Sequence, residues 1–208
     1  MRAIFLDRDG VICENRTDHV KSWNEFQFLP GVKDSLAALS RLDLPIIVIT
    51  NQAAIGRGIV PAHVVEDIHR RMVADVEAFG GRIDRVVYCP HTPEEGCSCR
   101  KPEPGMLRQV ADDMGIDLSR SYVVGDAATD LMAGQRVGSQ AFLVLTGRGW
   151  QQLLPALRSV GHFTVIRNLM AATTHIVRAE LNFVDEKEIW SPAPLRRTRP
   201  ALSTAPSS

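Results

Sequence analysis

The chain has 208 residues, of which 45% are hydrophobic, so it can bury the core of one domain. Its 24 basic and 24 acidic residues give a formal net charge of zero, which provides no general case for binding nucleic acid or an anionic membrane. No apolar run approaches the roughly 20 residues of a transmembrane helix, so we expect neither nucleic acid nor a membrane as a partner.

The first predicted element is a buried strand at residues 3–6, and two carboxylates follow it directly. Asp7 and Asp9 are separated by one residue and are followed by Gly10. Two acids so close repel each other unless a cation or a proton intervenes. A Mg²⁺ ion would take oxygens here and leave room for a phosphate, which one aspartate could attack while the other handles the proton. The alternative interpretation is a strand followed by a solvated, aspartate-rich turn.

Helices and strands alternate along the rest of the chain. Hydrophobic spacing, proline starts and glycine stops predict helices at residues 31–42, 61–79, 105–114, 131–136, 150–159 and 169–181. Short apolar runs predict strands at residues 45–52, 86–88, 122–124 and 141–145, and an edge strand at residues 163–166. This alternation predicts an α/β fold with a Rossmann-like, doubly wound and mostly parallel sheet.

Polar or charged residues stand at the ends of several of these segments. They are Thr50, Asn51 and Gln52, then Arg100 and Lys101, then Asp126 and Asp130. Because the carboxyl ends of parallel strands meet at one edge of a sheet, where ligands bind, these residues can converge with the first two acids. The set contains what phosphoryl transfer needs: a nucleophile, a metal site, a hydroxyl donor and a lysine that neutralises charge.

In order and spacing, these segments resemble the haloacid dehalogenase (HAD) superfamily of phosphotransferases. The resemblance implies that Asp7 is the nucleophile that becomes an aspartyl-phosphate. It implies that Asp9 is the general acid and base and also touches Mg²⁺ through its backbone carbonyl. Thr50 and Lys101 would bind the transferring phosphoryl group.

The same resemblance implies a Mg²⁺ site at the sheet edge. Asp126 would be a ligand together with Asp7, and Asp130 would support the metal ligands. Asn51, Gln52 and Arg100 are the further substrate-binding candidates. Asn51 and Gln52 could close over the substrate, and Arg100 could bind a second anionic group bidentately. The alternative for Arg100 is a surface residue packed on the neighbouring loop.

A second cluster combines cysteine and histidine within eleven residues, at Cys89, His91, Cys97 and Cys99. Three thiolates and an imidazole make a closed tetrahedral shell that is typical of structural Zn²⁺. The alternatives are a disulfide or free thiols. No N-terminal signal peptide is recognisable, so we expect a cytoplasmic, reducing compartment in which disulfides are disfavoured.

Three further side chains, one thiol and two imidazoles, are not assigned to a metal site. Cys13 follows two apolar residues, and we expect it to be a buried small side chain. His63 and His69 fall in the predicted helix at residues 61–79 and are interpreted as surface or packing residues.

The cysteine-rich loop narrows the resemblance. The run from Cys97 to Met106, with the stretches at residues 26–32, 50–52 and 55–58, resembles the D-glycero-D-manno-heptose-1,7-bisphosphate 7-phosphatases and related histidinol-phosphate phosphatases. The resemblance covers roughly residues 1–175. Two residues depart from the group: Cys13 replaces a usual asparagine, and Ala127 follows Asp126 where several heptose enzymes have lysine or serine.

We therefore expect a phosphatase domain at residues 1–181 and a C-terminal extension at residues 182–208. From residue 191 the extension is rich in proline, serine and arginine and is predicted to be disordered. The alternative is a docking segment that uses Arg196, Arg197 and Arg199. Trp190 suggests some anchoring of the segment before it.

The sequence predicts a monomeric phosphomonoesterase with Mg²⁺ and a structural Zn²⁺, acting on a small phosphorylated metabolite. A sugar bisphosphate is the first choice of substrate. Histidinol phosphate and a nucleic-acid end phosphate are the alternatives that keep the chemistry. The alternative without catalysis is an interaction module that is stabilised by zinc.

Overall fold

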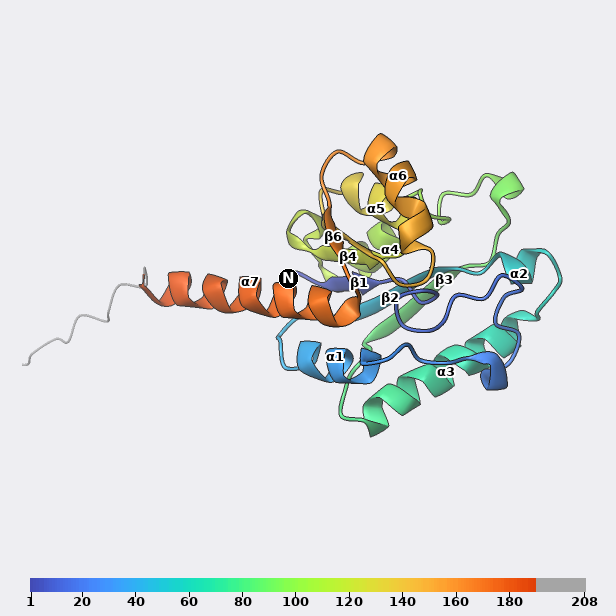
Figure 1. Cartoon of the computed structure of the whole chain (residues 1–208), viewed down its shortest axis with the longest axis horizontal. Helices are drawn as coiled ribbons and strands as arrows, with labels where there is room; N and C mark the ends of the chain where they lie inside the picture. Colours follow the sequence, from blue (N-terminus) through green and yellow to red (C-terminus); the bar gives the residue numbers. More distant parts are fainter. Residues whose placement is uncertain (190–208) are drawn as a thin grey trace, which may run out of the picture.

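The computed structural model describes residues 1–189, and side-chain surroundings are described up to residue 182. A six-stranded sheet lies at the centre of the molecule (Figure 1). Its strands are β1 (Ile4–Leu6), β2 (Ile46–Asn51), β3 (Arg85–Cys89), β4 (Tyr122–Gly125), β5 (Gln140–Val144) and β6 (Thr164–Ile166). Every pair of neighbouring strands is parallel, in the order β3-β2-β1-β4-β5-β6. The predicted doubly wound sheet is thereby confirmed, with β6 at its edge as expected.

Helices cover both faces of the sheet (Figure 1). They are α1 (Val32–Leu39), α2 (Ala53–Gly56), α3 (Ala62–Ala78), α4 (Gly105–Met114), α5 (Ala128–Gln135), α6 (Gly149–Ser159) and α7 (Leu169–Ile189). Among the described residues, single 3₁₀ turns occur at Trp23–Glu25, Pro93–Glu95 and Leu118–Arg120. Helices α1, α3 and α7 pack on one face, and α4, α5 and α6 pack on the other.

The strands are apolar on both sides because both faces of the sheet are covered. In β1, Ile4 and Leu6 pack with the core under α1, α3 and α7, whereas Phe5 packs with α4. All three side chains are fully buried. This burial holds β1 rigidly in the centre of the sheet and fixes the residues that follow it.

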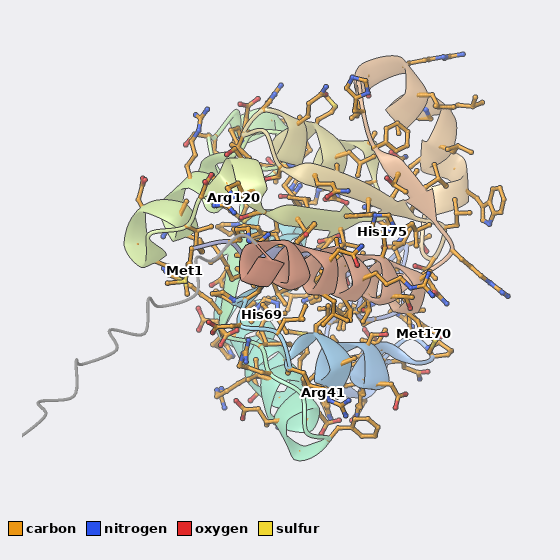
Figure 2. All side chains as sticks on the ribbon, turned by 90° about the vertical axis from the view of Figure 1, so that its left-hand side faces the viewer. Met1, Arg41, His69, Arg120, Met170 and His175 are labelled. Carbon is orange, nitrogen blue, oxygen red and sulfur yellow. The ribbon has the colours of Figure 1, made fainter. Side chains whose placement is uncertain are left out.

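Helix α7 is longer than predicted. It was expected to end at residue 181 but continues to Ile189, through a segment without glycine or proline. The buried carboxylate of Glu180 attaches it to the body, because it accepts hydrogen bonds from Arg2 Nη2 and Tyr122 Oη, both at 2.6 Å. Figure 1 shows the N-terminus beside the middle of α7, and Figure 2 views this helix from the side toward which it projects, with Met1 and Met170 labelled on either side of it.

Two other differences concern helix limits. Helix α5 begins at Ala128, three residues before the predicted start, because the Asp130 carboxylate accepts a hydrogen bond from the backbone of Ala127 and closes the first turn. The short helix α2 was not predicted.

None of the helices that the structure describes is both long and apolar enough to cross a membrane. The predicted tail, with Trp190, Arg196, Arg197 and Arg199, lies outside the described residues.

Candidate active site

Three carboxylates meet at the carboxyl ends of β1 and β4. One oxygen from each of Asp7, Asp126 and Asp130 lies within 4.8 Å of the others, and all three residues are buried. The chain continues from β1 and from β4 to opposite sides of the sheet. Doubly wound sheets bind their ligands at this switch point, so the cluster occupies the expected place in the fold.

Lys101 is the cation inside this cluster. Its Nζ lies 2.8 Å from Asp7 Oδ1 and 2.7 Å from Asp130 Oδ1, and it donates to the Ile49 carbonyl oxygen at 2.8 Å. Burial disfavours the charged ammonium, but the two carboxylates outweigh burial and raise the pKa of Lys101. The ammonium is therefore charged at neutral pH and faces the predicted nucleophile.

Lys101 contacts two of the three buried acids, Asp7 and Asp130, and its single charge does not balance both. Burial raises the pKa of Asp7 to about 7; the charge of Lys101 opposes this rise, and Asp130 and Asp126 add to it. Burial and Asp130 likewise raise the pKa of Asp126, against the opposing charge of Arg148. Carboxylate oxygens are the ligands that Mg²⁺ prefers, and a divalent cation here would offset the repulsion and keep Asp7 ionised. The donor set thus fits Mg²⁺.

The Asp9 side chain is not part of the cluster formed by Asp7, Asp126 and Asp130. Its two oxygens accept from Arg8 Nη2, each at 2.9 Å, and further hydrogen bonds come from Gln52 Nε2 at 2.9 Å and Cys13 Sγ at 3.4 Å. Burial opposes the charged form, but Arg8 and Gln52 outweigh it and lower the pKa of Asp9. The Asp9 side chain is 20% exposed at the edge of a cavity, where it can exchange a proton.

A buried network behind Asp9 was not marked by the sequence. The Arg8 side chain is 1% exposed, and its Nη1 lies 3.0 Å from Nε2 of His69 on α3. Burial and the charge of Arg8 lower the pKa of His69 to about 3, so the neutral imidazole accepts the hydrogen bond. His69 is therefore the packing residue that we expected, and Cys13 is buried as expected. Both residues contribute to holding the Arg8–Asp9 pair.

The end of β2 brings its three polar residues to the same place. Gln52 Nε2 donates to Thr50 Oγ1 at 2.9 Å, so Gln52 links Thr50 to Asp9. Asn51 pairs with the backbone of Lys101 in both directions: Nδ2 donates to the carbonyl oxygen at 3.0 Å, and Oδ1 accepts from the N–H at 3.1 Å. Asn51 thereby fixes the main chain that carries the lysine.

A cavity of about 630 Å³ opens over these groups. Of the predicted residues, its lining includes Asp7, Asp9, Thr50, Asn51, Gln52, Arg100, Lys101 and Asp130. Part of the wall comes from the loop at residues 14–23, where His19 has a left-handed backbone with a φ of 64°. Asp126 lies beneath the cavity with no exposure. The predicted site is thus one concave surface with buried acids at its floor.

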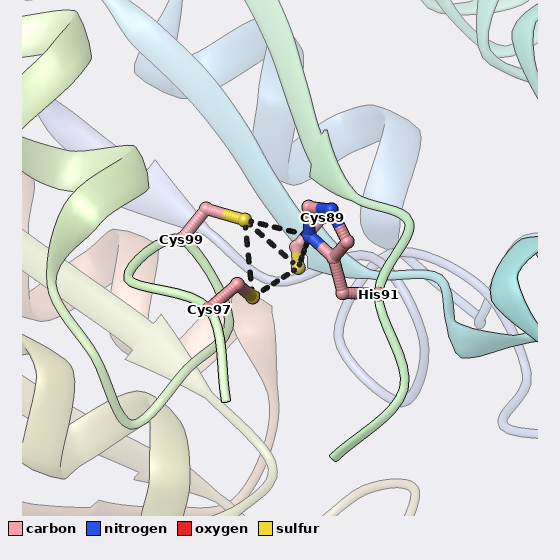
Figure 3. Close-up of side chains that lie close together, drawn as sticks. All are labelled: Cys89, His91, Cys97 and Cys99. Atoms are coloured by element: carbon pink, nitrogen blue, oxygen red, sulfur yellow. Dashed lines mark hydrogen bonds between the residues drawn. The ribbon is translucent and has the colours of Figure 1, made fainter. Parts of the chain in front are cut away.

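The cysteine cluster lies at the end of β3 and in the loop that follows it (Figure 3). Sγ–Sγ separations among Cys89, Cys97 and Cys99 are 3.1–3.5 Å, and His91 Nδ1 lies 3.2 and 3.5 Å from two of the sulfurs. A disulfide needs about 2.05 Å, whereas the edges of a tetrahedral Zn²⁺ shell measure roughly 3.5–3.8 Å. The three cysteines of the cluster form no disulfide in this structure, so the cluster is compatible with Zn²⁺.

Comparisons with known proteins agree with this geometry. A family model described as HAD-hydrolase-like matches residues 98–172. The D-glycero-β-D-manno-heptose-1,7-bisphosphate 7-phosphatase of Pseudomonas putida is 44% identical over 74% of this chain and 87% of its own length. The protein of that name from Bordetella bronchiseptica is 39% identical over 74% of this chain and 86% of its own. The chain belongs to this phosphatase family within the HAD-like hydrolases.

Solved structures of the family extend the match to the fold. The crystal structure of the Bordetella bronchiseptica D,D-heptose 1,7-bisphosphate phosphatase, complexed with magnesium and phosphate, superposes with a TM-score of 0.82 and 34% identity. It covers 86% of this chain and 99% of that one. The Burkholderia thailandensis phosphatase gives a TM-score of 0.66 and 30% identity over 85% and 99% of the two chains. The predicted recognition of the family is thereby confirmed.

In this member of the family, the cysteine-rich loop is attached to the cavity wall. Arg100, directly after the last cysteine, donates from Nη1 to the His91 carbonyl oxygen at 3.1 Å and also lines the cavity. The backbone N–H of Gln52 donates to the Cys89 carbonyl oxygen at 2.7 Å. The cysteine-rich loop and the phosphate-binding candidates on β2 are therefore connected.

One segment of the site escaped the sequence predictions altogether. Residues 146–148, between β5 and α6, lie against the acid cluster, and the backbone N–H of Arg148 donates to Asp126 Oδ2 at 2.8 Å. The signal was present, since this segment follows a predicted strand as the other polar segments do. It contains no acid or lysine, so it did not stand out.

Proposed function

We propose that this chain is a Mg²⁺-dependent phosphomonoesterase that removes the 7-phosphate of D-glycero-β-D-manno-heptose 1,7-bisphosphate. The observation that carries the proposal is Asp7, a buried carboxylate at the mouth of a polar cavity, 2.8 Å from the Lys101 ammonium. The names of the relatives support the heptose substrate. The bound magnesium and phosphate of the structural relative support the metal and the reaction class.

In the first step, an oxygen of Asp7 attacks phosphorus and forms an aspartyl-phosphate. Lys101 and the Thr50 hydroxyl bind the oxygens of the transferring group, and Lys101 neutralises charge that the buried site cannot disperse. Asp9 protonates the leaving alkoxide. A dianionic phosphate entering beside Asp9 raises its pKa by like-charge repulsion, which favours proton uptake before this step.

In the second step, Asp9 acts as the base. It takes a proton from a water molecule, which attacks the aspartyl-phosphate and releases phosphate. The hydrogen bonds from Arg8 and Gln52 favour the carboxylate that this step requires. Asp7, Asp126 and the backbone carbonyl of Asp9 would hold the Mg²⁺, with Asp130 in support; when bound, it stabilises negative charge on the phosphoryl oxygens.

Release of inorganic phosphate from a panel of phosphorylated metabolites tests this proposal. With Mg²⁺ present, we expect the heptose bisphosphate to give the highest kcat/KM, and only one of its two phosphates to be released. Histidinol phosphate, other sugar monophosphates and a 5′-phosphorylated oligonucleotide serve as competitors. A clear preference for any of them would reassign the substrate. If no compound of the panel released phosphate, the non-catalytic interaction module would be the remaining interpretation.

We predict that Arg100→Ala separates bisphosphate from monophosphate substrates. Arg100 lines the cavity and stands next to Lys101, so it can bind the phosphate that is not transferred. A bidentate charged contact is worth roughly 1.5–3 kcal/mol, so kcat/KM for the bisphosphate should fall by about tenfold to a hundredfold. The kinetic constants for p-nitrophenyl phosphate should change little. Equal losses on both substrates would rule out this role for Arg100.

We further propose that the phosphatase domain spans residues 1–181 and acts as a monomer in the cytoplasm. The three thiols of the cysteine loop support a reducing compartment, because they must stay reduced to bind a metal. The neutral net charge supports a small-molecule substrate over nucleic acid.

A further inference from the structure

The segment at residues 146–148 is fixed against the loop that follows β1. The Thr146 hydroxyl donates to the Gly10 carbonyl oxygen at 2.6 Å. Gly147 has a left-handed backbone with a φ of 56°, and a Cβ at this position would overlap Gly10 and the Asp126 carboxylate. A Cβ at Gly10 would also overlap Asp126. Only glycine allows both loops to close around this acid, so the position of the next residue is defined.

Arg148 is that next residue, and its guanidinium covers Asp126. Nη2 lies 3.2 Å from Oδ1 and Nε lies 3.4 Å from Oδ2. Within the part of the chain that the structure describes, it is the only side chain bonded to Asp126. The Asp126 side chain has no exposure, whereas that of Arg148 is 46% exposed. A buried acid is therefore paired with a cation that is free to leave on its solvent side.

The backbone and the guanidinium of Arg148 both contact Asp126, and the backbone contact is the more firmly held of the two. The backbone N–H of Arg148 makes the short bond of 2.8 Å, and the loop holds it in place. The guanidinium bonds are longer and belong to a flexible, half-exposed side chain. If the guanidinium left, the backbone bond would remain and the carboxylate would stay oriented. The side chain is thus the exchangeable part of the pair.

Asp126 is also one of the three acids that fit a divalent cation. A guanidinium and a Mg²⁺ ion bound to the same carboxylate would repel each other at short range. Lys101 also contacts acids of this set, Asp7 and Asp130, but its side chain is only 3% exposed and has no solvent side to turn to. Arg148 is therefore the cation that can leave its carboxylate when a metal binds.

We propose that Arg148 is the resident counter-cation of Asp126, that Mg²⁺ displaces its guanidinium, and that the freed guanidinium then binds an anionic oxygen of the substrate. Arg148 lines the cavity beside Gln151, so the displaced side chain has the substrate space next to it. Its planar fork of donors suits phosphate oxygens. The inference rests on the proposed function. It adds an order of binding, in which Mg²⁺ binds first and thereby frees Arg148 to contact the substrate.

The first test is Mg²⁺ binding to substrate-free protein, measured by titration calorimetry at fixed ionic strength. Arg148→Gln removes the competing charge and should tighten the Mg²⁺ dissociation constant by about threefold to tenfold, as expected for a half-exposed ion pair. Arg57→Gln is the matched control, because Arg57 lines the same cavity and is not bonded to Asp126. It reports how much of the effect is general electrostatics and should change the constant by less than about twofold.

The second test is steady-state kinetics at saturating Mg²⁺. Arg148→Gln should raise KM for the heptose bisphosphate by about tenfold and change kcat by less than about threefold, as for a lost binding contact. Arg148→Lys keeps the charge without the fork, so its KM should fall between those of wild type and Arg148→Gln. Melting temperatures of the three proteins exclude misfolding as the cause of a change.

Unchanged or weaker Mg²⁺ binding in Arg148→Gln would overturn the competition, and an unchanged KM would overturn the substrate contact. Equal tightening in Arg57→Gln would also overturn the specific pairing. These failures are distinct from failure of the proposed function. In that case the wild-type protein itself would bind no Mg²⁺ or release no phosphate.

Discussion

Asp7→Asn should abolish turnover, with a loss of kcat of about 10³-fold or more, while the fold and the metal content of the cysteine loop stay intact. The amide has nearly the shape of the carboxylate but is a poor nucleophile. Lys101 keeps its contacts with Asp130 and with the Ile49 carbonyl, so the buried ammonium remains compensated. Phosphate release under single-turnover and steady-state conditions measures the effect.

The same variant should not be less stable than the wild type when Mg²⁺ is absent. The pKa of Asp7 is raised to about 7 in the folded protein, above the value of 3.8 for an unperturbed carboxyl. The folded state therefore binds the Asp7 proton more tightly than the unfolded state does. As the pH rises from about 4 through 7, the ionisation of Asp7 lowers the stability of the folded protein. The uncharged amide of the variant avoids this loss, so its melting temperature should exceed that of the wild type most clearly above pH 7.

Asp112→Asn is the matched control, because Asp112 is an exposed acid on α4 outside the cavity. It should leave turnover unchanged and should not reproduce this dependence of melting temperature on pH. Turnover near the wild-type level in Asp7→Asn would refute the aspartyl-phosphate mechanism. A melting temperature of Asp7→Asn that falls further below the wild type as the pH rises would refute the uncompensated charge at this site.

The sheet was predictable because its strands are buried on both faces and read as continuous apolar runs. The run before Asp7 and the run before Thr50 lie side by side in the sheet, and each delivers its polar residues to the same edge. Parallel topology turns an order in sequence into a place in space. The identity of the acids and the lysine could therefore be predicted together with their convergence.

Other features depend on contacts between residues distant in sequence, which no local pattern reveals. Arg8 looks like a spacer between two acids until His69, on α3, accepts its hydrogen bond. Asn51 looks like a substrate ligand, but its amide also pairs with the backbone of Lys101. The length of α7 could not be predicted, since Leu181 is followed by neither glycine nor proline and the helix simply continues.

Cys97→Ser should remove the metal from the cysteine loop and lower the melting temperature by on the order of 10 °C. Purified wild-type protein should carry about one Zn²⁺ per chain, bound by the four residues of the cluster. Loss of a structural metal costs several kcal/mol, and about 1 kcal/mol corresponds to 2–4 °C in a domain of this size. A closed shell offers no open coordination position, so kcat should fall less than stability does at temperatures where the variant is folded.

Cys13→Ser is the control for this experiment, because Cys13 is the one cysteine outside the cluster and lies buried beside Asp9. It should retain the full Zn²⁺ content measured by elemental analysis. Wild-type protein without zinc, or Cys97→Ser with unchanged melting, would count against the site. KM for the bisphosphate should rise in Cys97→Ser, since Arg100 is positioned through the His91 carbonyl oxygen. An unchanged KM after verified zinc loss would show that the cavity wall keeps its shape without the metal.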